Sequence, residues 1–138
     1  MCGSFRQTTR ALTRRYETAL RPLGLRATQF TILQALSLAG EVTQNRLGEI
    51  LGTDSTTLTR TLLIMVKEGW IAERRAEDRR ERRLVLAKGG QALFNRALPI
   101  WEKVQSRLRH QLGKQAWENL LEITHQVTEL VTTQGDSL

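Results

Sequence analysis

The chain is poor in the residues that build disulfide frameworks and metal sites. It has one cysteine and two histidines among 138 residues, and these three stand far apart in the sequence. A single cysteine excludes an internal disulfide, and the wide separation gives no spacing typical of metal ligands. We therefore expect no metal ion and a reducing, cytoplasmic environment.

Long hydrophobic runs are missing too. No segment approaches the roughly 18 uninterrupted apolar residues that a membrane span requires, and the start, MCGSFRQTTRALTRR, lacks the apolar run of a secretory signal. The sequence also shows no nucleophile–base pair and no phosphate loop, since Gly89-Gly90 alone is too weak a signal. We expect no membrane-spanning segment, no enzymatic activity and no cofactor.

Positive charge is what the chain has in excess. There are 21 Lys and Arg against 14 Asp and Glu, a net charge of +7, while 40% of the residues are hydrophobic. The hydrophobic content and the length suit one folded domain. The excess charge favours a polyanionic partner, either nucleic acid or an anionic membrane surface. Total charge does not distinguish nucleic acid from a membrane surface, so the positions of the arginines in the sequence have to decide between these partners.

Apolar residues recur at helical spacing at the start of the chain. The pattern predicts a helix that begins near Phe5 and is stopped by Pro22 and Gly24. A second helix fits Thr28–Leu38, with Gly40 after its end.

The chain is again helical from Lys88 to its end. Pro99 is expected to bend this stretch or weaken one hydrogen bond, and Gly113 permits a break. The apolar stripe is too long to be buried against so small a body, which predicts a helical dimer interface. We thus expect one domain over 1–138, with a central lobe at about 28–87 and dimerisation helices at about 4–22 and 88–134.

A short helix, a tight turn and another helix lie between these segments. The short helix fits Gln44–Leu51, and the next begins after Thr53 or Asp54 and runs to Glu68. Its outward face carries Ser55, Thr56, Thr59, Arg60 and Lys67. Small hydroxyl side chains approach phosphates and base edges closely, and an arginine serves a phosphate or a guanine edge. An ordinary capped surface helix is the alternative interpretation.

A highly charged segment follows. Trp70–Ala72 and Leu84–Leu86 are strand-like runs on either side of it, which predicts a β-hairpin. Six arginines fall within ten residues, Arg74, Arg75, Arg79, Arg80, Arg82 and Arg83. Such a run is usually a solvated face, but arginines at a hairpin tip also suit the negative potential of a narrow minor groove. Asp78 is close enough to Arg80 to pair with it. The order helix, turn, helix, hairpin predicts a winged helix-turn-helix that binds DNA.

The stretch from Leu47 to Gly90, LGEILGTDSTTLTRTLLIMVKEGWIAERRAEDRRERRLVLAKGG, resembles the core of the MarR family, the multiple-antibiotic-resistance regulators. Asp78-Arg79-Arg80, followed by Arg82, Leu86 and Gly90, matches the family's hallmark, and the flanking helices extend the resemblance over essentially the whole chain. The resemblance implies a mainly α homodimer with a small β-hairpin wing. It also implies binding to a pseudo-palindromic operator, usually as a repressor, and release by a small ligand or by cysteine oxidation.

The resemblance assigns roles by position. Contacts to the major groove and to phosphates fall to Ser55, Thr56, Thr57, Thr59 and Arg60. In the wing, Arg80 becomes the minor-groove finger and Asp78 its buttress, and we count Arg79 and Arg82 among the DNA-binding residues. Arg26 and Ala87 depart from the family, because they stand where a threonine commonly precedes a helix and caps it.

The signal that releases DNA has two explanations. Cys2 lies 22 residues before Gly24-Leu25, the spacing of the sensing cysteine in the organic-hydroperoxide branch of the family, and Tyr16 falls where that branch has a tyrosine able to hydrogen-bond it. Ala27 stands near the branch's second tyrosine, so half of the partner set is missing. An incidental cysteine on a frayed terminus is the alternative.

The other explanation is a small apolar or aromatic acid lodged between the dimer helices and the central lobe. Its predicted lining is Tyr16, Phe30, Leu33 and Trp101, although aromatic residues at helical spacing more often belong to the core. The alternative function for the whole chain is a winged-helix module that binds protein or RNA.

Overall fold

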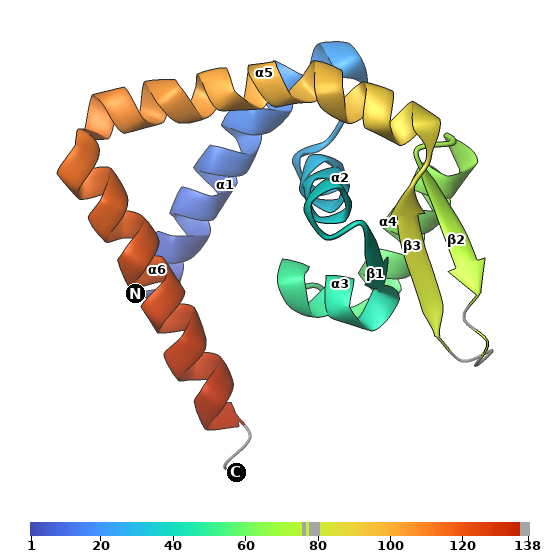
Figure 1. The fold of residues 1–138 in the computed structure, drawn as a ribbon. Coiled ribbons are helices and arrows are strands. Elements are labelled where there is room, and N and C mark those ends of the chain that lie inside the picture. Colours follow the sequence, from blue (N-terminus) through green and yellow to red (C-terminus); the bar gives the residue numbers. More distant parts are fainter. Residues whose placement is uncertain (76, 78–80, 136–138) are drawn as a thin grey trace. The chain divides into compact units, whose positions relative to one another are not determined.

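The computed structural model describes residues 1–75, 77 and 81–135 (Figure 1). The chain divides into two compact units, Met1–Trp101 and Glu102–Leu138. The first unit contains, in order, α1 (Cys2–Leu20), the 3-10 turn η1 (Arg21–Leu23), α2 (Ala27–Ala39), β1 (Glu41–Thr43), α3 (Gln44–Leu51), α4 (Ser55–Lys67), β2 (Ile71–Arg75) and β3 (Arg82–Leu86). Helix α5 (Lys88–Leu112) begins in the first unit and ends in the second, which also holds α6 (Lys114–Gly135). The predicted class, mainly α with a small β-hairpin wing, is confirmed.

The first helix starts earlier than its apolar pattern suggested. Helix α1 begins at Cys2, three residues before Phe5, because helix formation does not require that the first turn be apolar. It ends at Leu20, and Pro22 then occupies the 3-10 turn, where its missing N–H is not needed. Gly24 has a left-handed φ of 67°, which ends the segment as predicted.

The sheet has one strand more than the predicted hairpin. Its order is β1-β3-β2, with both pairings antiparallel. Strand β1 is only three residues long and gives no readable alternation. Strands β2 and β3 extend to Arg75 and from Arg82, further into the arginine-rich segment than predicted, since a solvated hairpin accepts charged side chains on both faces.

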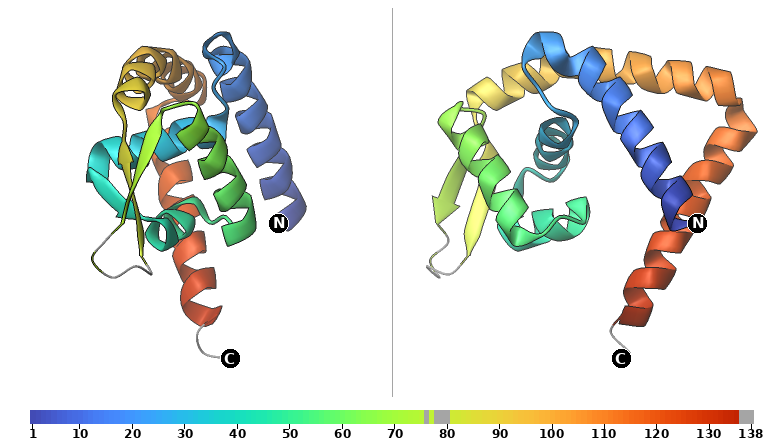
Figure 2. Two further views of the ribbon diagram at one scale, coloured as in Figure 1. Left: turned by 90° about the vertical axis from the view of Figure 1, so that its right-hand side faces the viewer. Right: turned by 180° about the vertical axis from the view of Figure 1, so that it is seen from behind.

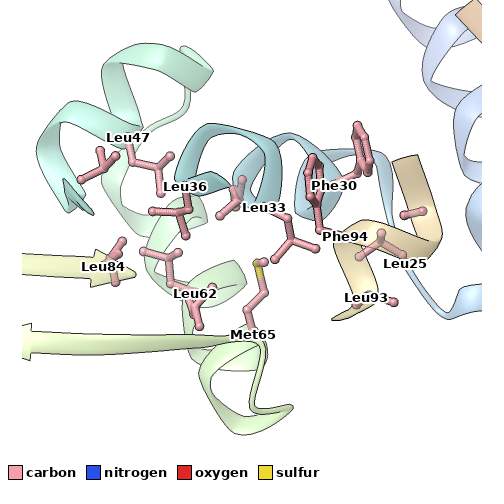
Figure 3. Packing of buried hydrophobic residues seen from close by; sticks show 14 of the residues in the cluster. Leu25, Phe30, Leu33, Leu36, Leu47, Leu62, Met65, Leu84, Leu93 and Phe94 are labelled. Atoms are coloured by element: carbon pink, nitrogen blue, oxygen red, sulfur yellow. The ribbon is translucent and has the colours of Figure 1, made fainter. Parts of the chain in front are cut away.

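The core of the first unit is built around α2. Phe30, Leu33 and Leu36 of α2 point inward, and Leu62 and Met65 of α4 pack against them (Figure 3). The rest of the buried cluster comes from the flanking elements: Leu20, Leu25, Ile32, Val42, Leu47, Leu58, Ile71, Leu84, Leu93, Phe94 and Ala97. Residues of α3, α4 and the three strands all contribute to this single buried cluster, so the cluster fixes their positions relative to α2.

The start of α2 is capped by a side chain within the helix rather than by the side chain of the residue that precedes it. Arg26 precedes the helix in an extended conformation and supplies no side-chain cap. Gln29 replaces part of that loss, because its side-chain oxygen accepts a 2.9 Å hydrogen bond from the backbone N–H of Arg26. The expected loss of a cap at Arg26 is therefore partial.

The first turn of α5 passes very close to the end of α4. A Cβ built on Gly90 would lie 1.8 Å from the backbone oxygen of Trp70, and one on Gly89 would lie 2.8 Å from that of Gly69. The Trp70 oxygen also accepts a 3.0 Å hydrogen bond from the Ala87 N–H. Only glycine fits at position 90, which explains in physical terms one residue of the family hallmark.

The second unit consists of the last part of α5 and α6. Helix α5 passes through Pro99 without ending, and Gly113, with a φ of 82°, breaks the helical stretch where expected. Several large apolar side chains are exposed: Leu112, Leu120, Leu121, Ile123, Leu130 and Val131. Among the described residues, neither these two helices nor any other has the length and apolarity needed to cross a membrane.

Candidate nucleic-acid interface

Helices α3 and α4 are each fixed at their first turn by a side-chain cap. The hydroxyl of Thr43 accepts a 3.2 Å hydrogen bond from the Arg46 N–H. At the start of α4, Asp54 accepts from both the N–H and the hydroxyl of Thr57, at 2.9 and 2.8 Å. These bonds, the amide first, hold the pKa of Asp54 below its ordinary value, so this carboxylate stays ionised at neutral pH. Asp54, and not Thr53, is thus the N-cap.

The hydroxyl side chains of α4 fall into two groups. Ser55 and Thr56 are exposed, as is Arg60, and they lie on the outward surface of the helix. Thr57 is committed to the cap. Thr59 is only half exposed, and its hydroxyl donates to the Ser55 carbonyl at 2.7 Å and accepts from Gln44 Nε2 at 3.0 Å. Ser55, Thr56, Thr57 and Arg60 are thus exposed, with the Thr57 hydroxyl bonded to Asp54, whereas Thr59 is half-exposed and bonded to Ser55 and Gln44.

The wing, defined as β2 and β3, places arginines opposite arginines. The antiparallel register sets Arg74 against Arg83 and Arg75 against Arg82. Directly opposed side chains lie on the same face of a sheet about 5 Å apart, so these two pairs of like charges repel one another. Asp78, Arg79 and Arg80 lie outside the described residues.

Acidic side chains offset part of the positive charge of the arginines at the start of β3. Arg82 lies 3.9 Å from Glu73, and Arg83 lies 3.9 Å from Glu41 and 3.6 Å from Glu81. All five side chains are at least one-third exposed, so each pair contributes little to stability. The wing therefore keeps a concentrated positive charge.

A small cavity of about 130 Å³ lies between the start of α3 and the start of β3. It is lined by Thr43, Gln44, Asn45, Glu81 and Arg82. Sequence reasoning missed Gln44 and Asn45, whose only signal is their place directly after the cap Thr43. In both views of Figure 2, α3, the start of α4 and the far end of the wing lie on the same side of the first unit.

Proteins of known structure share the fold of this chain. The model of the MarR family matches residues 23–81. The Mycobacterium tuberculosis transcriptional regulator MosR, solved in complex with DNA, is 30% identical with a TM-score of 0.81, and the match covers 94% of this chain and 97% of MosR. This chain belongs to the MarR family.

Two further proteins are similar to this chain. The HTH-type transcriptional regulator YwoH of Bacillus subtilis is 33% identical over 82 residues, which span 59% of this chain and 60% of YwoH. A mutant of Escherichia coli MarR complexed with operator DNA is 24% identical, covers 89% of each chain and has a TM-score of 0.82; this likeness shows the fold alone. The MarR family and these relatives are regulators of transcription rather than enzymes.

The predicted redox pair of this MarR-family chain is widely separated within one protomer. Cys2 is exposed at the first position of α1, and Tyr16 stands on the same helix. Fourteen residues of helix at 1.5 Å each separate them by about 21 Å. A hydrogen bond between the two side chains therefore requires two protomers. The assignment of this chain to the organic-hydroperoxide branch stays a prediction.

The residues predicted to line a ligand pocket are packed together. The Trp101 ring stacks on Phe30 with centroids 5.4 Å apart and on Tyr16 at 6.2 Å, and Phe30 also stacks on Phe94 at 5.6 Å. Leu33 is fully buried beside them in the core. Burial raises the pKa of the Tyr16 phenol above its ordinary value, so the hydroxyl is neutral at physiological pH. A ligand at this place has to displace or extend the stack.

Proposed function

We propose that this MarR-family regulator binds duplex DNA, with α4 in the major groove and the wing in the neighbouring groove. The observation that carries the proposal is the register of the wing, which opposes Arg74 to Arg83 and Arg75 to Arg82. Opposed like charges destabilise a hairpin, so a polyanion that neutralises them gains binding free energy at this place. The exposed Ser55, Thr56 and Arg60 then serve as base and phosphate contacts.

The partner we favour is DNA rather than RNA or an acidic protein. A helix that presents short hydroxyl side chains and one arginine suits the wide major groove of B-form DNA, whereas the major groove of A-form RNA is too narrow to admit it. The DNA complex of MosR, at 30% identity, supports the same choice. Arg79 and Arg80 at the wing tip, with Asp78 as buttress, stay part of the proposal from the sequence.

The proposal includes a homodimer that represses transcription from a pseudo-palindromic operator. Exposed apolar side chains of α5 and α6, such as Leu112, Leu121 and Leu130, give the second unit a surface that a second copy would bury. Two copies would place their α4 helices in successive major grooves. The boundaries of about 4–22, 28–87 and 88–134 for the dimerisation helices and the central lobe belong to this proposal.

The experiment that tests the proposal is selection of bound sequences from a random duplex library, with mixed-sequence RNA of equal length as competitor. A duplex recovered by selection should not be displaced by RNA at equal concentration, because α4 cannot enter the RNA major groove. Displacement by RNA, or by an acidic protein that binds the wing, would favour the alternative function.

Release of the operator is proposed to follow either oxidation of Cys2 or binding of a small aromatic ligand near Tyr16 and Trp101. Cys2 is exposed, as a thiol that meets peroxide must be. The measurement is peroxide-induced release of the selected duplex by the wild-type protein and by Cys2→Ser. The oxidation hypothesis predicts that the variant no longer responds, and an unchanged response would leave only the ligand.

A further inference from the structure

We propose that Gln44 is a positioning residue that holds the recognition helix α4 in its DNA-reading orientation through Thr59. The inference rests on the proposed DNA-binding function, and it reassigns Thr59 from a DNA contact to half of a bond between α3 and α4. Gln44 Nε2 donates a 3.0 Å hydrogen bond to Thr59 Oγ1. Among the described residues, this is the side-chain hydrogen bond that connects the two helices of the motif.

The hydroxyl of Thr59 has little capacity left for DNA. A threonine hydroxyl offers one donor and two acceptor positions. Its proton is directed to the Ser55 carbonyl at 2.7 Å, and one acceptor position takes the Gln44 amide. The side chain is also only half exposed, whereas Ser55, Thr56 and Arg60 are exposed. Thr59 thus keeps a single acceptor position, on a half-exposed side chain, before DNA arrives.

Gln44 is itself well anchored. It is the first residue of α3, directly after the Thr43 cap, and it is half-buried. The preceding residue, Thr43, pairs with Arg83 near the start of β3, and Gln44 lines the cavity together with Glu81 and Arg82. Gln44 thus directly follows a strand that is paired with β3, and its bond to Thr59 connects α4 to this same point of the fold, which restrains α4 relative to the wing. Both elements must engage the same duplex, which makes their relative position matter for affinity.

The experiment is a double-mutant cycle on the preference for the selected duplex over random duplex. Gln44→Ala and Thr59→Val each remove the bond, and each should reduce the preference by about two- to tenfold. The combined variant should lose no more than either single variant, because the same bond is lost once. Thr59→Ser keeps the hydroxyl and should retain most of the preference. If instead the two losses multiply, each side chain contacts DNA independently and the proposal is wrong.

Two controls separate positioning from instability and from general loss of binding. Gln91→Ala removes a comparable bond, from Gln91 Nε2 to Asn95 Oδ1 at 2.9 Å on α5, and should leave the preference unchanged. The unfolding midpoints of the Gln44 and Thr59 variants should be close to that of Gln91→Ala, because an exposed or half-buried hydrogen bond contributes little to global stability. A midpoint that falls in step with the preference would show that Gln44 acts through stability and would overturn the proposal.

Nuclear magnetic resonance of the free protein tests whether the hydrogen bond between Gln44 and Thr59 forms in the absence of DNA. The side-chain amide resonances of Gln44 should shift in Thr59→Val and stay in place in Thr59→Ser. An unchanged Gln44 amide in Thr59→Val would contradict the bond itself. A wild-type protein that prefers no duplex sequence would instead refute the proposed function, and the amide resonances would still report whether α3 and α4 are joined.

Discussion

Replacing Gly90 with alanine is expected to lower the free energy of unfolding by about 3 kcal/mol or more, at the upper end of overpacking effects. The added Cβ would lie 1.8 Å from the Trp70 backbone oxygen, far inside contact distance. Relief requires that α5 or the end of α4 move, which disturbs the 3.0 Å hydrogen bond from Ala87 to that oxygen. Urea denaturation followed by circular dichroism measures the change.

Gly48→Ala is the matched control for this prediction. Gly48 also lies in a helix, but its added Cβ would meet Leu58 Cδ2 at 3.5 Å and the Thr53 oxygen at 3.6 Å, which is ordinary contact. Helix propensity alone favours alanine at both positions by about 1 kcal/mol. Gly48→Ala should therefore be neutral or stabilising. Equal stability of the two variants would show that α5 does not approach Trp70 as closely as the structure has it.

The double variant Arg74→Ala/Arg75→Ala is expected to lose DNA affinity by about ten- to a hundredfold near 0.15 M salt, while its stability stays equal or rises. Each arginine that neutralises a phosphate contributes about 0.9 to the slope of log K against log salt, so the slope should fall by about two. Stability should not fall, because the change removes the repulsion of Arg74 by Arg83 and of Arg75 by Arg82. Fluorescence anisotropy at several salt concentrations measures both affinity and slope.

The double variant is expected to lose DNA affinity but not stability, and this difference distinguishes a DNA-binding role of Arg74 and Arg75 from a structural one. Arg96→Ala, an exposed position on α5, changes charge away from the wing and should leave the slope nearly unchanged. An equal loss of slope in Arg96→Ala would mean that only total charge matters. A loss of stability in the double variant would mean that Arg74 and Arg75 support the fold.

The sequence predicted best what depends on local pattern. The starts of α3 and α4 follow from the hydroxyl cap Thr43 and the carboxylate cap Asp54, which act within a few residues. The break at Gly113 was predictable for the same reason. The resemblance to the MarR family was recognisable because the hallmark residues, from Asp78 to Gly90, lie close together in the sequence.

What the sequence did not yield depends on contacts between distant segments. Strand β1 exists because Val42 pairs with Leu84, and three residues alone carry no signal of that pairing. The role of Thr59 depends on Gln44, fifteen positions earlier, so the hydroxyl looked as available as that of Ser55. Cys2 and Tyr16 looked like partners by family position, whereas their place on one continuous helix keeps them apart within a protomer.

Binding-site selection from a random duplex library tests the central claim most directly. The account predicts recovery of a pseudo-palindrome whose half-sites lie about one helical turn apart, because two α4 helices of one dimer read successive major grooves. Affinity for that duplex should fall steeply with salt and exceed affinity for random duplex by about a thousandfold or more. Recovery of no preferred sequence, with binding that merely fades as salt rises, would contradict a sequence-specific regulator and leave only a basic winged-helix surface.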